Sequence, residues 1–178
     1  MDTSTKTIIS NNIIKEDNLF VDSKLNYKIV LKPIELKHPI KNVLTNKLKK
    51  LIENKCIEYG YVLPDSIVLD ELNYPIIERG NIIYHLNYTC KLCYPVEGMI
   101  LECICDIISR GGIHAKYEYI NENNEIINPI EIYILREHNL ENPIFNRVKE
   151  KDKIKVCVIG TRIEINNPKI YVIAKLVE

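Results

Sequence analysis

Residues 90–117 read CKLCYPVEGMILECICDIISRGGIHAKY, and the interpretation of this stretch decides the fold. In one interpretation the four cysteines bind a structural zinc ion, because paired cysteines two or three residues apart can converge on one tetrahedral metal. In the other, the stretch contains β-strands separated by a connection at Pro95 to Gly98 and a tight turn at residues 109–112.

The spacing of the cysteines favours strands. Successive side chains of a strand point to opposite faces, so Cys90 and Cys93 cannot both face one ion from a regular strand. Cys103 and Cys105 share a face, but isoleucines and a leucine flank them, and a free cysteine in such a strand behaves as a small apolar residue. We therefore expect no metal and interpret Pro95 and Gly98 as a hinge between two modules.

Composition and charge narrow the class of protein. The chain has 178 residues, 46% of them hydrophobic, which suffices for one medium domain or two small ones. Its 24 basic and 24 acidic residues cancel, so no overall charge demands nucleic acid or a membrane as partner. The sequence lacks a long apolar run and a secretory signal pattern, which predicts an intracellular protein with reduced thiols.

A compositional bias points to the source. The chain contains 32 isoleucines and 19 asparagines but only two alanines. Isoleucine and asparagine have A/T-rich codons and alanine has G/C-rich codons, so the bias predicts an A/T-rich genome. Together with the short chain and the N-terminal extension, this bias leads to the hypothesis that the source is a large cytoplasmic DNA virus.

The first half of the chain predicts a helix on a small antiparallel sheet. Residues 1–24 are polar and are expected to form a flexible extension. Alternation from Leu25 predicts a strand, and Pro39 marks the start of a helix whose apolar residues recur at helical spacing up to Ile52. Extended segments at residues 61–72 and 82–94 complete this module, which spans residues 25–94.

The second half, residues 95–178, predicts a five-stranded barrel. Strands are expected at residues 99–108, 113–120, 130–134, 154–165 and 169–177, with a polar loop at 121–128 and a longer connection before the fourth strand. This pattern is typical of an OB-type barrel, so the predicted fold class is α+β. Such barrels often bind single-stranded nucleic acid on one open face.

Four short motifs carry a resemblance to a known family: VLKP at residues 30–33, YPVEG at 94–98, RGGI at 110–113 and DKIKVCV at 152–158. Their order over residues 25–178 resembles the stalk subunit of multisubunit DNA-directed RNA polymerases. That subunit is the seventh subunit of the eukaryotic enzymes and E-prime in archaea.

The resemblance implies partners and surfaces. An N-terminal tip module would dock on the polymerase core, against the clamp of the largest subunit and a neighbouring small subunit. An S1-type barrel would lie near nascent RNA and touch it weakly, and a second stalk subunit is the usual companion in this family. The implied core interface comprises Pro33, Ile34, His38, Pro39, Tyr74, Pro75, Arg79 and Gly80.

The barrel departs from the S1 pattern in two respects. Many S1 domains place an aromatic side chain after the turn glycine, where this chain has Ile113. Residues 95–178 carry 11 basic and 13 acidic residues, a net charge of about −2. RNA contact would therefore depend on a local cluster, for which the candidates are Arg110, Lys116, Tyr117 and Arg136.

Nothing in the sequence matches a catalytic motif, since it has no phosphate-binding glycine loop, no zinc-protease helix and no nucleophile elbow. We expect an accessory subunit that is not itself an enzyme, has no cofactor and does not contact a membrane. If viral, it would be found in the virion and in viral factories of the host cytoplasm; otherwise it would be nuclear. The alternatives are a free-standing S1-type RNA-binding protein of translation or RNA decay, and a zinc-stabilised adaptor.

Overall fold

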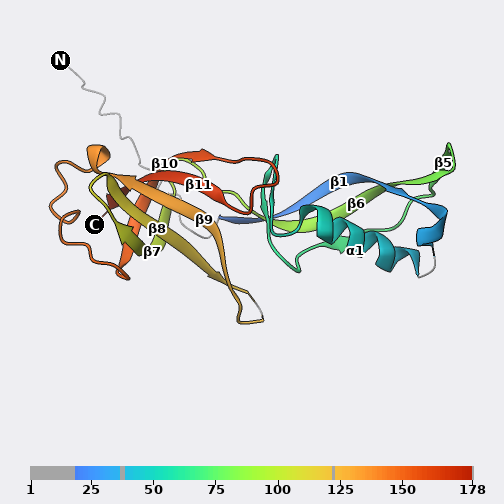
Figure 1. The fold of residues 1–178 in the computed structure, drawn as a ribbon, viewed down its shortest axis with the longest axis horizontal. Helices are drawn as coiled ribbons and strands as arrows, with labels where there is room; N and C mark the ends of the chain where they lie inside the picture. The colour runs from blue at the N-terminus through green and yellow to red at the C-terminus, as the bar shows by residue number, and fades with distance from the viewer. Residues whose placement is uncertain (1–18, 37–38, 122, 178) are drawn as a thin grey trace, which may run out of the picture.

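The computed structural model describes residues 19–36, 39–121 and 123–177, and in these ranges the protein is mostly β. A closed five-stranded barrel occupies one end of the elongated molecule, and a sheet with one α-helix occupies the other (Figure 1). No helix within the described ranges is long and apolar enough to cross a membrane.

The barrel is built from the five strands that the sequence predicts. They are β7 (Ile100–Ile108), β8 (Gly112–Ile120), β9 (Ile126–Leu135), β10 (Lys153–Arg162) and β11 (Ile170–Val177). Their order around the barrel is β10-β11-β9-β8-β7. The β9–β11 pair is parallel and the other pairs are antiparallel, which makes the barrel OB-like.

The six-stranded sheet is organised around its longest strand, β6. Its strands are β1 (Phe20–Leu31), β2 (Cys56–Ile57), β3 (Gly60–Val62), β4 (Val68–Leu69), β5 (Ile76–Glu78) and β6 (Asn81–Cys93). The main order is β1-β6-β3-β2, and β4 and β5 also pair with β6. β1 and β6 are antiparallel and remain in register over the whole of β1, from Phe20 opposite Cys93 to Leu31 opposite Ile82.

The helix α1 (Ile40–Ile52) covers one face of this sheet, and its predicted start at Pro39 is confirmed. Its apolar side chains recur every four residues, so Leu44, Leu48 and Ile52 are buried together. They join the buried side chains of β1 and β6 in one core cluster. Of the predicted α+β fold, the structure contains one α-helix packed on a sheet and an OB-like barrel, and most of its regular structure is β.

Several element boundaries differ from the prediction. β1 begins at Phe20, so residues 20–24, which were assigned to the extension, form part of the strand because they pair with residues 89–93 of β6. The predicted segment 61–72 is two short strands, β3 and β4. The polar loop predicted at 121–128 ends early, because β9 begins at Ile126 and accommodates Pro129 beside a register shift opposite Tyr117 and Tyr119.

Two cores meet where the sheet joins the barrel. Cys90 belongs to the core under α1, whereas Cys93, three residues later, belongs to the barrel core, as the odd spacing predicts. Cys103 and Cys105 are also buried in the barrel core. Leu19 and Tyr61, from the sheet end of the chain, complete that core. The barrel core is therefore continuous with one end of the sheet.

Main-chain hydrogen bonds fix this junction. The Cys56 N–H donates to the Asn167 carbonyl, and the Asn166 N–H donates to the Cys56 carbonyl, each over 2.8 Å. In the connection at residues 94–99, the Gly98 N–H donates to the Val158 carbonyl over 2.9 Å. Residues 95–98 thus carry the chain from β6 to β7 and are bonded to the barrel.

Candidate functional surfaces

The end of the sheet farthest from the barrel carries four exposed apolar side chains. After β1, residues Pro33–Glu35 form a single 3-10 turn, η2, on which Ile34 is exposed. Tyr74 precedes β5 and has 98% of its surface exposed. Ile77 of β5 is 77% exposed, and Ile76 is exposed as well. We call Ile34, Tyr74, Ile76 and Ile77 the apolar end.

The predicted core interface lies at this same end. Pro33 and Ile34 are in η2, Pro39 begins α1, Tyr74 and Pro75 lead into β5, and Arg79 and Gly80 form the β5–β6 turn. His38 lies outside the described residues. Ile76 and Ile77 lie at the same end but are not among the residues expected from the sequence, where the pair of isoleucines directly after Pro75 was the available signal.

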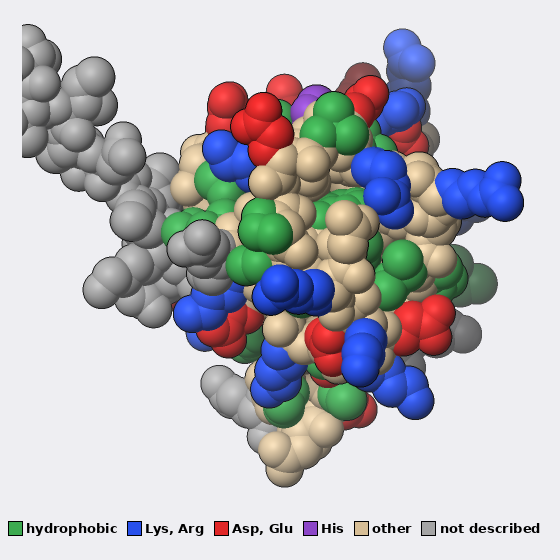
Figure 2. Space-filling view, turned by 90° about the vertical axis from the view of Figure 1, so that its left-hand side faces the viewer, with side chains coloured by type: hydrophobic (Ala, Val, Ile, Leu, Met, Phe, Trp, Pro, Cys, Tyr) green, Lys and Arg blue, Asp and Glu red, His purple; other side chains and the backbone are tan. Residues whose placement is uncertain are grey.

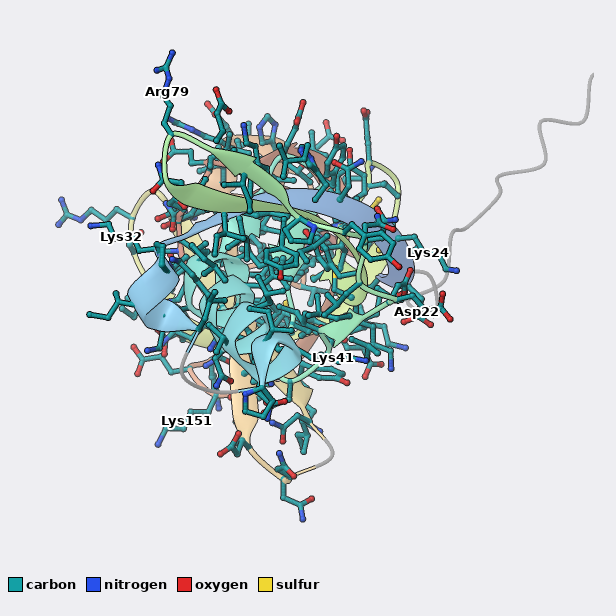
Figure 3. All side chains as sticks on the ribbon, turned by 90° about the vertical axis from the view of Figure 1, so that its right-hand side faces the viewer. Asp22, Lys24, Lys32, Lys41, Arg79 and Lys151 are labelled. Carbon is teal, nitrogen blue, oxygen red and sulfur yellow. The ribbon has the colours of Figure 1, made fainter. Side chains whose placement is uncertain are left out.

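Charged side chains project around the apolar end. Figure 3 shows Lys32, Lys41 and Arg79 pointing outward from it. Glu35 is held inward, because its carboxylate accepts hydrogen bonds from the Lys32 N–H and the Lys47 ammonium. These bonds lower the pKa of Glu35, chiefly through the Lys32 N–H. The loop after β1 is thereby tied to α1, which presents Ile34 in a defined position.

At the opposite end of the molecule, the β7–β8 turn meets the connection that follows β9. The Arg136 Nε–H donates to the Arg110 carbonyl over 3.1 Å, and its guanidinium lies 5.1 Å from the centre of the Phe145 ring. The guanidinium of Arg110 itself is exposed and makes no hydrogen bond or ion pair to the described residues. A shallow groove of about 430 Å³, lined also by Leu135 and Leu140, runs beside both arginines.

Figure 2 views this barrel end and shows lysines and arginines interspersed with acidic residues, not gathered in one basic patch. Of the four residues predicted to contact RNA, the structure brings Arg110 and Arg136 together here. The Arg136 guanidinium donates hydrogen bonds to the Arg110 carbonyl and to Asn146, and it lies over the Phe145 ring. The Arg110 guanidinium is therefore the one more available to a ligand.

The other two predicted RNA contacts lie elsewhere. Tyr117 points into the barrel core with only 7% of its surface exposed, and its ring lies 6.2 Å from that of Phe20. It cannot offer a free face to a base, because strand alternation turns it inward with Ala115. Lys116 points outward, but its ammonium is 2.7 Å from the Asp106 carboxylate.

The outer face around Lys116 carries a charge network that joins β7, β8 and β9 and includes Lys169, directly before β11. His114 of β8 lies between two carboxylates, with Nδ1 3.5 Å from Asp106 and Nε2 3.8 Å from Glu131. Glu131 also accepts a hydrogen bond from Lys169. Burial alone would raise the pKa of Glu131. The hydrogen bond from Lys169 and the nearby positive charges lower this pKa by more, so the net shift is downward. The hydrogen bond from Lys116 lowers the pKa of Asp106.

The rings of His114, Tyr133 and Tyr171 lie beside this network, and this group of rings was not predicted from the sequence. The His114 and Tyr133 rings are 5.1 Å apart, and the Tyr133 and Tyr171 rings are 6.3 Å apart. A groove of about 560 Å³ extends from Tyr133 and Tyr171 towards Gly160 and Arg162. The alternation of β8, β9 and β11 could have shown that these side chains face outward, but not that they are neighbours.

The six cysteines are mostly buried. Five of the six are buried and the sixth, Cys157, is half-buried. Burial raises the pKa of the Cys56 and Cys90 thiols to about 11 and also raises that of Cys93. Within the described ranges, no three side chains of His, Cys, Asp or Glu come together at metal-binding distance.

Comparison with known proteins gave one informative similarity. The chain is 27% identical over 175 residues to a protein of Acanthamoeba polyphaga mimivirus described as a "putative DNA-directed RNA polymerase subunit". The similarity covers 92% of this chain and 84% of the viral protein. No protein-family model matches the chain. The similarity thus spans both the sheet and the barrel.

Proposed function

We propose that the protein is a non-catalytic stalk subunit of a DNA-directed RNA polymerase. Residues 25–94 act as the tip domain that docks on the core near the clamp, and residues 95–178 form an S1-type barrel that lies near nascent RNA. The observation that carries the proposal is the similarity to a viral polymerase subunit over nearly the whole chain.

The apolar end supports docking at the tip. Single exposed apolar residues are common on a monomer, but four of them at one end, two nearly or largely exposed in adjoining strand and loop positions, favour that end as an interaction surface. Tyr74 and Ile77 contribute little to the fold, because they are almost fully exposed. Their burial against a partner would instead contribute about 1.5–3 kcal/mol for each side chain. The rim of Lys32, Lys41 and Arg79 fits a partner surface with acidic residues around an apolar centre.

Docking is tested with a matched pair of variants. Ile77→Glu places a carboxylate at the apolar end, and Leu140→Glu places one at the barrel end, where the leucine is equally exposed at 77%. We expect both to fold normally and only Ile77→Glu to lose at least about tenfold in affinity for the core enzyme, the cost of an unpaired charge in an apolar contact. Equal binding by both variants in a pull-down with purified core would refute docking at this end.

Two barrel surfaces are suited to RNA. Arg110 offers a free guanidinium for phosphate, and the rings of His114, Tyr133 and Tyr171 offer surfaces on which bases can stack. The barrel carries a small net negative charge, so contact with RNA must be local and weak. Weak contact suits a subunit that is held beside the RNA by the rest of the enzyme.

RNA contact is tested in the assembled polymerase with a photoreactive nucleotide in the emerging transcript. Tyr133→Leu should reduce crosslinking to this subunit by about fivefold or more, since one stacked base is worth about 1–3 kcal/mol. Arg110→Ala should also reduce it, because it removes a charged contact to phosphate. Tyr59→Leu removes an exposed tyrosine of the turn between β2 and β3 and should leave crosslinking unchanged. Strong binding of the free protein to RNA at physiological salt would instead favour the free-standing RNA-binding protein.

A further inference from the structure

The outer edge of β1 is open. Among the residues that the structure describes, β1 pairs with β6 alone. The Leu19 carbonyl faces β6, where it accepts from the Tyr94 N–H, whereas the Val30 carbonyl faces away and accepts from the Lys47 ammonium. Because the main-chain groups of successive residues point to opposite edges of a strand, the even-numbered residues of β1 present theirs at the open edge.

Most of this edge is accessible to another strand. Lys47 covers only the far end, at Val30. Nearer the barrel, Asp22, Lys24 and Asn26 are exposed, and their N–H and C=O groups have no strand beside them among the described residues. An edge of this kind is a template for a strand of another chain.

An apolar groove runs beside the open edge. It has a volume of about 360 Å³, and its lining includes Val21 and Leu25 of β1 together with Tyr59 and Tyr94. Val21 and both tyrosines are exposed. A strand added at the edge would place alternate side chains over this groove, because side chains alternate between the two faces of a strand.

The sequence of β1 is complementary to itself at this position. With a two-fold axis at Ser23, the stretch VDSKL places Val21 opposite Leu25 of a second copy and Asp22 opposite Lys24, each pair occurring twice. Apolar pairs and opposite charges directly across two antiparallel strands stabilise them. Figure 3 shows Asp22 and Lys24 projecting from the same side of the molecule.

Neighbouring positions of the axis fit less well. An axis at Asp22 or at Lys24 would set that residue opposite its own copy, and like charges directly across a strand pair are destabilising. An axis at Leu25 would pair Asp22 with Lys28, but the exposed Val21 would then face a side chain that is already buried in the core under α1. The axis at Ser23 therefore gives the best match of charge and apolar surface.

We propose that two copies of this chain associate through the open edge of β1, antiparallel about a two-fold axis at Ser23. Residues 20–26 of each copy pair with the same residues of the other, and the two apolar grooves meet. The paired stretch is short, so the dimer should exchange with the monomer. The inference concerns the free protein and does not depend on the proposed polymerase role.

Sedimentation velocity of the full chain in reductant tests the association. The parent should shift from monomer towards dimer as its concentration rises. Lys24→Asp creates two like-charge pairs and should weaken association at least about tenfold. Lys28→Asp makes the same change on the same face of β1, outside residues 20–26, and should leave association unaltered. A parent that stays monomeric at every concentration would overturn the proposal, and so would equal association of the two variants.

Two further variants test the axis. Asp22→Lys combined with Lys24→Asp restores opposite charges across it, so this double variant should associate as the parent does. Ser23→Cys should form an intermolecular disulfide on mild oxidation, because Cα atoms of such a pair lie about 4.5 Å apart, within disulfide reach. Asn26→Cys, which faces Phe20 of the other copy, should not. A double variant that stays monomeric, or as much crosslinking by Asn26→Cys as by Ser23→Cys, would overturn this arrangement.

Discussion

Gly112 begins β8 at a point where the chain passes very close to β9. A Cβ atom on Gly112 would lie 2.3 Å from the Ile134 carbonyl oxygen, a distance that forces the backbone to move. Gly111, one residue earlier, has only the Ser109 hydroxyl within reach, at 3.9 Å. The RGGI motif thus contains one glycine that the barrel requires and one that it tolerates.

Gly112→Ala is therefore expected to lower the free energy of unfolding by about 1–3 kcal/mol, the usual cost of overpacking, whereas Gly111→Ala should change it by less than about 0.5 kcal/mol. Urea denaturation of the two variants measures the difference. Similar stabilities would show that the β8–β9 contact is looser than the structure indicates.

The buried thiols predict how stability depends on pH. Cys56 and Cys90 have folded-state pKa values of about 11, raised by burial from 9.0. Unfolded thiols ionise first as the pH rises, so the unfolded state then binds fewer protons than the folded state and gains stability relative to it. The contribution of these two thiols to the free energy of unfolding should be constant below about pH 8.5 and fall between about pH 9 and 11.

Denaturant unfolding at pH 8, 9 and 10 in the presence of reductant checks this dependence. Cys90→Ala should be less stable than the parent at pH 8 but should lose stability more slowly above pH 9. A decline of equal slope in parent and variant would assign the pH dependence to other groups, of which the buried tyrosines Tyr61 and Tyr88, with pKa values raised by burial to about 12, are the nearest candidates.

Among the elements, α1 shows what the periodicity of apolar residues can and cannot predict. Its start after Pro39 and its apolar stripe to Ile52 are visible in the sequence, because helical spacing and a proline at the first turn are local signals. Leu48 and Leu51 both look apolar and helical, yet Leu48 is fully buried and Leu51 is 42% exposed. The stripe is narrower than the sequence suggests.

Leu48→Ala should cost about 2–5 kcal/mol of stability because it leaves a cavity under the helix, and Leu51→Ala should cost under about 1 kcal/mol. Thermal or chemical denaturation distinguishes them. If the two variants were equally stable, α1 would not pack on the sheet through the Leu44–Leu48–Ile52 stripe.

Features that depend on distant pairing were harder to predict. Residues 20–24 read FVDSK and show no regular alternation of apolar and polar side chains, but β6 pairs with them across the sheet. The inward direction of Tyr117 follows from the register of the barrel, which the strand pattern alone leaves ambiguous by one residue. The proximity of Arg110 to Arg136, which are 26 residues apart, is likewise a consequence of barrel closure.

At the scale of the molecule, the sheet and the barrel share a core. Leu19, Tyr61 and Cys93 complete the barrel's interior, and Phe20 packs against Tyr119 with ring centres 4.5 Å apart. A barrel of residues 95–178 alone would expose this apolar surface. It should therefore unfold at lower denaturant concentration than the full chain, which should unfold in one cooperative transition. Two separate transitions in the full chain would contradict this coupling.

The polymerase role is tested most directly by affinity purification of the tagged full chain from cells of its source, followed by mass spectrometry. The account predicts that the large RNA polymerase subunits are recovered with it in comparable amounts and that the Ile77→Glu variant loses them. Recovery of ribosomal proteins or translation factors in place of polymerase subunits would contradict it.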